Sequence, residues 1–132
     1  MIHILGCNET IYAKKGIITS QNYPNDYPPS TICLYHIQAP SNNKIKLIFD
    51  MVDIEKDKKC SYDFLEVWEV RDSNFHLTDR ICGNNHVHPI VSNDNNLFIQ
   101  FQSDNVSQHQ GFKLEFNHVP PKPGKYGPFN NK

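Results

Sequence analysis

The chain has 132 residues, of which 38% are hydrophobic and 11% aromatic, so it is long enough for one domain that buries its own core. Its formal net charge of −1 at pH 7 excludes the long-range attraction by which basic proteins find nucleic acids or anionic membranes. The sequence has no run of about 18 apolar residues, so we expect no membrane-spanning helix.

Apolar and polar residues alternate along most of the chain, a pattern that is typical of β-strands with one buried face. Groups of Pro, Asn, Asp and Ser, which favour turns, separate the alternating segments. No segment has apolar residues at helical spacing, so we predict an all-β protein, an antiparallel β-sandwich of at least six strands. In chain order, the predicted strands are 16–19, 34–38, 44–49, 64–70, 97–102 and 112–117.

The alternation is lost after Val119. Residues 120–132 are rich in Pro and Gly, which favour extended or flexible backbone. We therefore predict one domain, residues 1–119, followed by a C-terminal tail or linker, residues 120–132. At the other end, residues 1–6 are too short for a signal peptide and lack its basic n-region, so we interpret the chain as a mature or cloned form without its leader.

Four cysteines, Cys7, Cys33, Cys60 and Cys82, allow three disulfide pairings. A structural zinc site is disfavoured because no two of them have the close spacing of such sites. Asn8 and Asn105 each begin an Asn-x-Ser/Thr triplet for N-glycosylation. Cysteines and triplets together predict a secreted, extracellular glycoprotein with disulfide bonds.

Several short motifs follow one another in a fixed order along the chain. They are GIITSQNYPNDYP from Gly16, CLYHI from Cys33, YDFLEV from Tyr62, ICG from Ile81, and SD to GF between residues 103 and 112. In this order and spacing the chain resembles the CUB domain family, a secreted sandwich module of complement proteases, tolloid proteases, neuropilins, cubilin and spermadhesins. The resemblance runs from Cys7 to about Val119.

The resemblance implies the disulfides Cys7–Cys33 and Cys60–Cys82. Two positions depart from the family pattern. Tyr35 stands where the family has tryptophan, an exchange of one core aromatic for another. Residues 69–72 lack the glycine turn that commonly follows this strand, so we expect a longer hairpin there.

Two acidic loops, residues 53–63 and 103–107, contain Glu55, Asp63 and Asp104. The resemblance implies that these three carboxylates bind Ca²⁺, a cation that prefers six to eight oxygen ligands in proteins. The alternative interpretation is that they are solvated loop acids, because Asp and Glu are mostly exposed. Asp53 and Asp57 are interpreted as ordinary surface acids.

The resemblance also implies carbonyl ligation from the stretch after Asp104, with Asn105 or Val106 as the donor. It implies that Tyr23 supports the site by hydrogen bonding. In calcium-binding CUB domains the ion orders the loops and leaves carboxylate oxygen for a partner's lysine or arginine, which can form charge-assisted hydrogen bonds. The implied partner is an extracellular protein that presents Lys or Arg, and a glycan at Asn105 would stand beside the ion.

Other residue groups support different hypotheses. Five lysines, Lys44, Lys46, Lys56, Lys58 and Lys59, could bind a sulfated glycan, although strand edges and loops often carry lysine for solubility. This lectin-like module and a noncatalytic domain of a secreted protease are the alternatives to a calcium-binding recognition module.

Two further groups have weaker signals. His86 and His88 share one face of an extended segment but have no third ligand in view, so we interpret them as surface histidines. Tyr62, Phe64 and Trp68 are interpreted as core or near-core residues, with carbohydrate stacking as the alternative. No catalytic motif is present, so we assign no catalytic residue and expect no enzyme activity.

Overall fold

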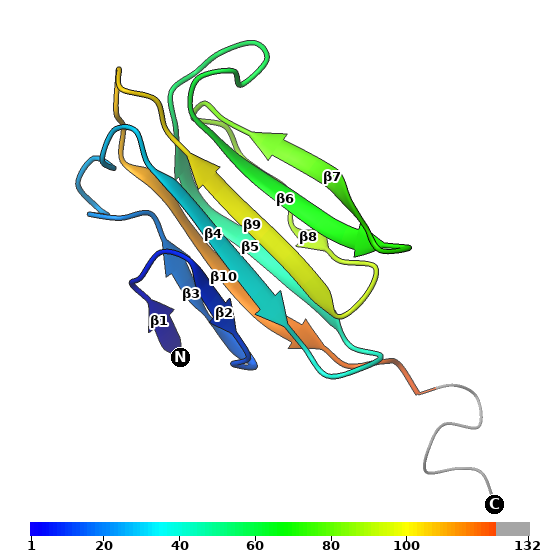
Figure 1. The fold of residues 1–132 in the computed structure, drawn as a ribbon. Helices are drawn as coiled ribbons and strands as arrows, with labels where there is room; N and C mark the ends of the chain where they lie inside the picture. Colours follow the sequence, from blue (N-terminus) through cyan, green and yellow to red (C-terminus); the bar gives the residue numbers. More distant parts are fainter. Residues whose placement is uncertain (124–132) are drawn as a thin grey trace, which may run out of the picture.

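The fold is a sandwich of two five-stranded β-sheets in the computed structural model, which describes residues 1–123 (Figure 1). The strand order is β1-β3-β10-β5-β8 in one sheet and β2-β4-β9-β6-β7 in the other. The strands are β1 (Ile2–Ile4), β2 (Glu9–Ile11), β3 (Lys15–Thr19), β4 (Ile32–Gln38), β5 (Lys44–Asp53), β6 (Phe64–Arg71), β7 (Asn74–Ile81), β8 (Ile90–Val91), β9 (Asn96–Gln102) and β10 (Gly111–Val119).

The predicted all-β sandwich with two disulfides is confirmed, with two additions. The short strands β1 and β2 pair in parallel with β3 and β4, so the sheets are antiparallel except at these edges. The four strands not expected from the sequence are β1, β2, β7 and β8. Three of them have three residues or fewer, and β7 is exposed at every position except its last, so none has a clear alternating pattern.

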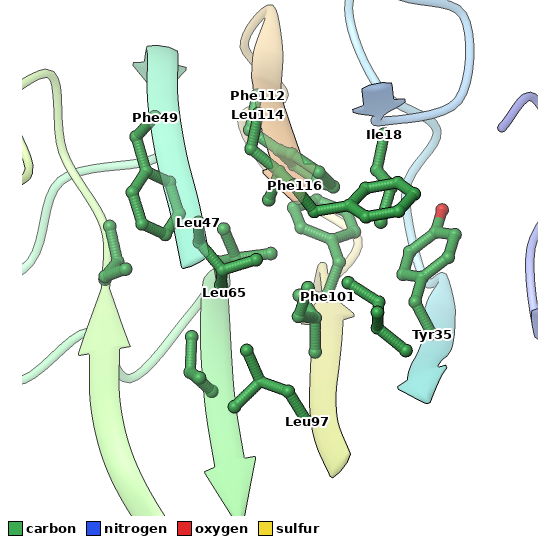
Figure 2. Packing of buried hydrophobic residues seen from close by; sticks show 14 of the residues in the cluster. Ile18, Tyr35, Leu47, Phe49, Leu65, Leu97, Phe101, Phe112, Leu114 and Phe116 are labelled. Carbon is green, nitrogen blue, oxygen red and sulfur yellow. The ribbon is translucent and has the colours of Figure 1, made fainter. Parts of the chain in front are cut away.

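The core lies between the inner faces of the two sheets, where the alternating apolar side chains interdigitate (Figure 2). Leu65 and Leu97 from one sheet and Leu47 and Leu114 from the other have no exposed surface. Tyr35 is 1% exposed in this layer, so a tyrosine fits where the family has tryptophan. Burial of each such side chain contributes on the order of 2 kcal/mol to stability.

The disulfides join Cys7 to Cys33 and Cys60 to Cys82, with S–S distances of 2.07 Å and 2.14 Å. This is the pairing that the CUB resemblance implies. The first disulfide ties the segment before β2 to β4, and the second ties the acidic loop before β6 to the end of β7.

The expectation of a longer hairpin after β6 is wrong. Only Asp72 and Ser73 separate β6 from β7, and their φ angles are 53° and 66°. Two successive positive φ angles are typical of the type I′ turn, whose twist matches that of the flanking strands. Aspartate tolerates this region, so the tight turn forms without the expected glycine.

The three aromatic residues expected in or near the core differ in their environments. Phe64 is buried, Trp68 is half-buried on the outer face of its sheet, and Tyr62 is 50% exposed. Within residues 1–123, no helix is long and apolar enough to cross a membrane. Most of the predicted tail, residues 120–132, lies outside the described residues.

β10 runs from one end of the sandwich to the other. It begins at Gly111 beside Asp53 and ends at Val119 beside Lys44, so it spans roughly 30 Å. The loops between β5 and β6 and between β9 and β10 lie at the first end, and Val119 lies at the other (Figure 1).

His118 is a buried polar residue near the end of β10. Its side chain is 8% exposed, and its Nε2 atom has no hydrogen-bond partner in the described part of the chain. Burial, with a smaller contribution from Lys14, lowers the pKa of His118 below its usual range. The folded state therefore holds this imidazole in its neutral form.

We predict that His118 destabilises the domain in mild acid. Because its folded pKa is lowered, the unfolded chain takes up the proton first, so its contribution to stability is present above the unfolded pKa and is lost as pH falls. Urea unfolding of wild type and His118→Leu between pH 7.5 and 5 should show a smaller loss of unfolding free energy in the variant. His86→Gln, an exposed control, should behave as wild type, and equal losses in all three proteins would refute the prediction.

Candidate metal centre

Three strand ends bring the two acidic loops together at one end of the sandwich. β5 ends at Asp53 just before Glu55, and β6 begins directly after Asp63. β9 ends at Gln102, which pairs with Phe64 of β6, so antiparallel pairing places the segment that follows β9 beside the segment that precedes β6. Asp63 and Asp104 therefore become neighbours although they are far apart in the sequence.

Asp63 anchors this end of the sandwich through its side chain, in which both oxygens accept hydrogen bonds. Oδ1 accepts from the Asp104 backbone N–H at 2.7 Å, and Oδ2 accepts from the Tyr27 hydroxyl at 2.6 Å. The residue has no exposed surface. A buried carboxylate without donors would cost several kcal/mol, so these two bonds are what makes its position possible.

Tyr27 connects the start of the first acidic loop, at Glu55, to the same group. Its hydroxyl accepts a hydrogen bond from the Glu55 backbone N–H at 3.2 Å while it donates to Asp63. The ring is 1% exposed and packs edge-on against Phe101, with 4.9 Å between ring centroids. Burial, and secondarily the bond to Asp63, raises the pKa of Tyr27, so the hydroxyl remains a donor at neutral pH.

Ligand oxygens of Glu55, Asp63 and Asp104 all lie within 4.8 Å of one another. Glu55 and Asp104 are half-buried, and the Oε1 atom of Glu55 is buried without a hydrogen-bond partner among the described residues. Burial, followed by the nearby charges of Asp63 and Asp104, raises the pKa of Glu55. Burial also raises the pKa of Asp63, against the opposing effect of its two hydrogen bonds.

This arrangement fits a hard divalent cation. Three carboxylates at this separation repel one another, and an ion between them would replace repulsion with attraction. Each carboxylate oxygen has two lone pairs, so Asp63 can keep both hydrogen bonds and still coordinate an ion. The unpartnered Glu55 oxygen is an independent sign that the site has unused acceptor capacity.

Asn105 and Val106 follow Asp104 in an exposed turn. The Val106 N–H donates to Asp104 Oδ1 at 3.0 Å, so the aspartate side chain shapes the turn that carries these two residues. The Asn105 side chain is exposed next to the cluster.

The tyrosine that the structure places against the cluster is Tyr27. Tyr23, expected in a supporting role, is half-buried earlier in the same loop, and its N–H donates to the Ser20 carbonyl at 3.2 Å. Both tyrosines precede a proline in the opening motif, so local sequence does not distinguish them. Their difference is in burial, which depends on contact with Phe101 in another strand.

Asp53 and Asp57 are not part of the carboxylate cluster. Asp53 lies 3.4 Å from the His109 ring. The Asp57 carboxylate accepts N–H bonds from Ser61 and Lys59, at 3.0 Å and 3.1 Å, and these bonds lower its pKa. Asp57 therefore stabilises the local backbone conformation of the acidic loop from Asp57 to Ser61.

The remaining candidate groups do not form comparable sites. Lys44 and Lys46 begin β5, whereas the lysines between Asp53 and Cys60 follow its end, so the two groups are roughly 25 Å apart and do not form one patch. The rings of His86 and His88 lie 5.3 Å apart between centroids. In residues 1–123, the carboxylate cluster is the only group of three or more metal-ligating side chains.

The chain is similar to known proteins along most of its length. A family model described as "CUB domain" matches residues 7–116. The chain is 36% identical over 107 residues to human Tolloid-like protein 1, a match that covers 81% of this chain and 11% of that protein. It therefore spans about a tenth of the length of this relative.

Two solved structures have the same fold. The MASP-1 CUB2 domain bound to Ca²⁺ superimposes with a TM-score of 0.74 at 30% identity, over 84% of this chain and 99% of that domain. The full extracellular region of zebrafish Gpr126/Adgrg6 superimposes with a TM-score of 0.77 at 30% identity, over 86% of this chain and 15% of the other.

We predict that Tyr27→Phe destabilises the domain and that Tyr23→Phe does not. The first change leaves Asp63 Oδ2 and the Glu55 N–H each without a partner, which costs about 1–3 kcal/mol for a buried polar group. Denaturant unfolding of both variants in the presence of a chelator measures the difference. Equal unfolding free energies for the two variants would show that the Tyr27 hydroxyl does not organise the loops.

Proposed function

The chain belongs to the CUB domain family, and from this membership we propose that it is a secreted, non-enzymatic module that binds Ca²⁺ and recognises an extracellular protein. The observation that carries the proposal is the convergence of Glu55, Asp63 and Asp104, whose ligand oxygens lie within 4.8 Å of one another. Extracellular calcium is abundant, so a site on a rigid sandwich needs only modest affinity there.

The proposed ligand set uses oxygen atoms from both acidic loops. Glu55, Asp63 and Asp104 supply carboxylate oxygens, a carbonyl of Asn105 or Val106 adds a further ligand, and water completes the six to eight that Ca²⁺ prefers. The ion would hold two loops that otherwise repel each other. The Ca²⁺-bound MASP-1 CUB2 domain, with the same fold, supports this assignment.

The extracellular location rests on two independent features. Two disulfides join all four cysteines, and such bonds persist mainly in oxidising compartments. The zebrafish protein of similar fold is described as an extracellular region. We further propose that the domain comprises residues 1–119 and that residues 120–132 form a tail or linker.

The partner that this site suits is a protein with an exposed lysine or arginine. Glu55 and Asp104 are both half-buried, so these two residues form the rim of the site. A carboxylate fixed by an ion can accept a charge-assisted hydrogen bond from an ammonium or guanidinium group. The divided lysine groups do not favour the alternative, a sulfated-glycan-binding module.

We predict that calcium stabilises the oxidised domain. At a hundredfold excess over the dissociation constant, linkage adds about 2.7 kcal/mol, which is on the order of ten degrees in melting temperature. Thermal unfolding in chelator and then in millimolar CaCl₂ measures the shift. Asp104→Ala should abolish the shift in melting temperature. Asp50→Ala, which removes an exposed carboxylate from the outer face of the β1-β3-β10-β5-β8 sheet, should preserve it. A missing shift in wild type would contradict calcium binding.

We predict that a lysine side chain binds at the calcium-loaded site. Titration with Nα-acetyl-lysine amide, followed by NMR of the labelled domain in CaCl₂, should shift the amide signals of Asp104 and Asn105. The shifts should disappear in chelator and weaken with added NaCl, because the contact is ionic. Nα-acetyl-norleucine amide is the matched probe without charge, and equal shifts from both compounds would contradict ionic recognition.

A further inference from the structure

The outer faces of the two sheets differ in chemistry. The face of the β1-β3-β10-β5-β8 sheet carries Lys46, Asp50, Lys113 and Glu115, which is ordinary for a solvated surface. The five strands of the other sheet contain no lysine, and several large apolar side chains point outward from them. The outward apolar residues are Ile32, Leu34, Trp68, Phe75, Leu77 and Phe98.

Part of this face forms a groove of about 260 Å³, lined by Leu34, Trp68, Phe75, Phe98 and Gln100. The Phe98 ring meets Phe75 edge-on, with 5.1 Å between centroids, and stacks on His36 at 4.1 Å. Phe75 is 61% exposed and Leu34 is 41% exposed, so the groove is open to solvent.

A charged network on the same sheet bonds to one residue of the groove, Trp68. The Trp68 indole N–H donates to Glu66 Oε1 at 3.2 Å. The other oxygen of Glu66 forms an ion pair with Arg80, whose guanidinium lies over the Phe64 ring. Glu66 is thus neutralised within the sheet, and Trp68 is positioned in advance of any contact. The side chains that line the groove are all uncharged.

One of the two glycosylation triplets adjoins this face. Asn8, Glu9 and Thr10 are exposed at the start of β2, the edge strand beside β4. The Asn8 side-chain oxygen, Oδ1, accepts a hydrogen bond from the Leu34 N–H at 3.1 Å. That bond does not use Nδ2, the atom to which an N-linked sugar is attached. Asn8 is thus fixed next to a residue that lines the groove.

We propose that Asn8 carries an N-glycan whose first sugars lie on this face, over Leu34 and toward the groove. N-acetylglucosamine is uncharged, its C–H groups pack on apolar and aromatic side chains, and its hydroxyl and acetamido groups can bond to Gln100. Leu34, whose N–H binds Asn8, is 41% exposed and connects the attachment point to the groove that it lines. The proposal rests on the extracellular location given under the proposed function.

Attachment to the chain makes the contact intramolecular. A tethered group has an effective concentration in the millimolar range, so weak stacking contacts suffice to hold it. The groove residues on β9 and β6 lie two and three strands from β2, about 10–15 Å at the normal strand spacing. The glycan would cover apolar surface that otherwise faces water.

A second copy of the chain fits the same region less well. Continuous pairing between copies at the groove side of the sheet would use the edge strand β7, but β7 is irregular opposite Val67 and Trp68. Bulges and charged residues on an edge oppose strand pairing between molecules, and β7 also carries Asp79 and Arg80. Dimerisation through the face is therefore an outcome that the test must distinguish.

The test uses Trp68, which is the single tryptophan of the chain and lines the groove. The full chain is produced by secretion from a cell line that attaches N-glycans, and mass spectrometry gives the occupancy of Asn8. Compared with Asn8→Gln, the glycosylated protein should show tryptophan emission at shorter wavelength and weaker acrylamide quenching. Asn105→Gln, which removes the other triplet, should not change either signal.

Leu34→Ser completes the design, because it removes the apolar contact and leaves the attachment site. In this background, the spectral difference between glycosylated protein and Asn8→Gln should be lost. An unoccupied Asn8, or an occupied Asn8 with unchanged emission and quenching, would overturn the proposal. Emission that changes with protein concentration, together with a dimer in sedimentation, would assign the face to a second copy instead.

The calcium melting shift is measured on the same samples. A normal calcium shift without a glycan effect overturns this inference alone. Loss of the calcium shift with a preserved glycan effect overturns the calcium site alone.

Discussion

The structure depends on a buried carboxylate, Asp63, which is not hydrated and needs hydrogen-bond donors from the protein instead. Its two bonds, from the Tyr27 hydroxyl and the Asp104 N–H, join the segment after β3, the acidic loop before β6 and the turn after β9. These segments share no continuous hydrogen-bonded strand at this point. The need to satisfy one charged group therefore orders the whole carboxylate end of the sandwich.

Sequence pattern predicts those parts of the fold in which one face is buried and the other is solvated. β4, β5, β9 and β10 have this property, and alternation located all four. β7 is exposed on both faces, so its residues are not under the same constraint and the pattern is absent. The tight turn at Asp72 and Ser73 depends on backbone conformation that glycine favours but does not monopolise.

The sequence predicts the candidate site only as far as the family motifs include its residues. The CUB resemblance implies Glu55, Asp63 and Asp104 as ligands, and the structure places these three residues together. Tyr27 could not be distinguished from Tyr23, because the choice depends on a contact with Phe101 across the core. The groove was also invisible, since Leu34, Trp68, Phe75 and Phe98 come from four strands whose order is a property of topology.

The position of Val119 has an architectural consequence. β10 carries the chain from the carboxylate end to the opposite end of the sandwich, and its last residue pairs with Lys44 there. In any longer polypeptide, a module joined after β10 would be attached at the base of this domain. The carboxylate end would then face away from that module, and the module would leave it exposed. Successive domains could be added behind it without altering the geometry by which it meets other molecules.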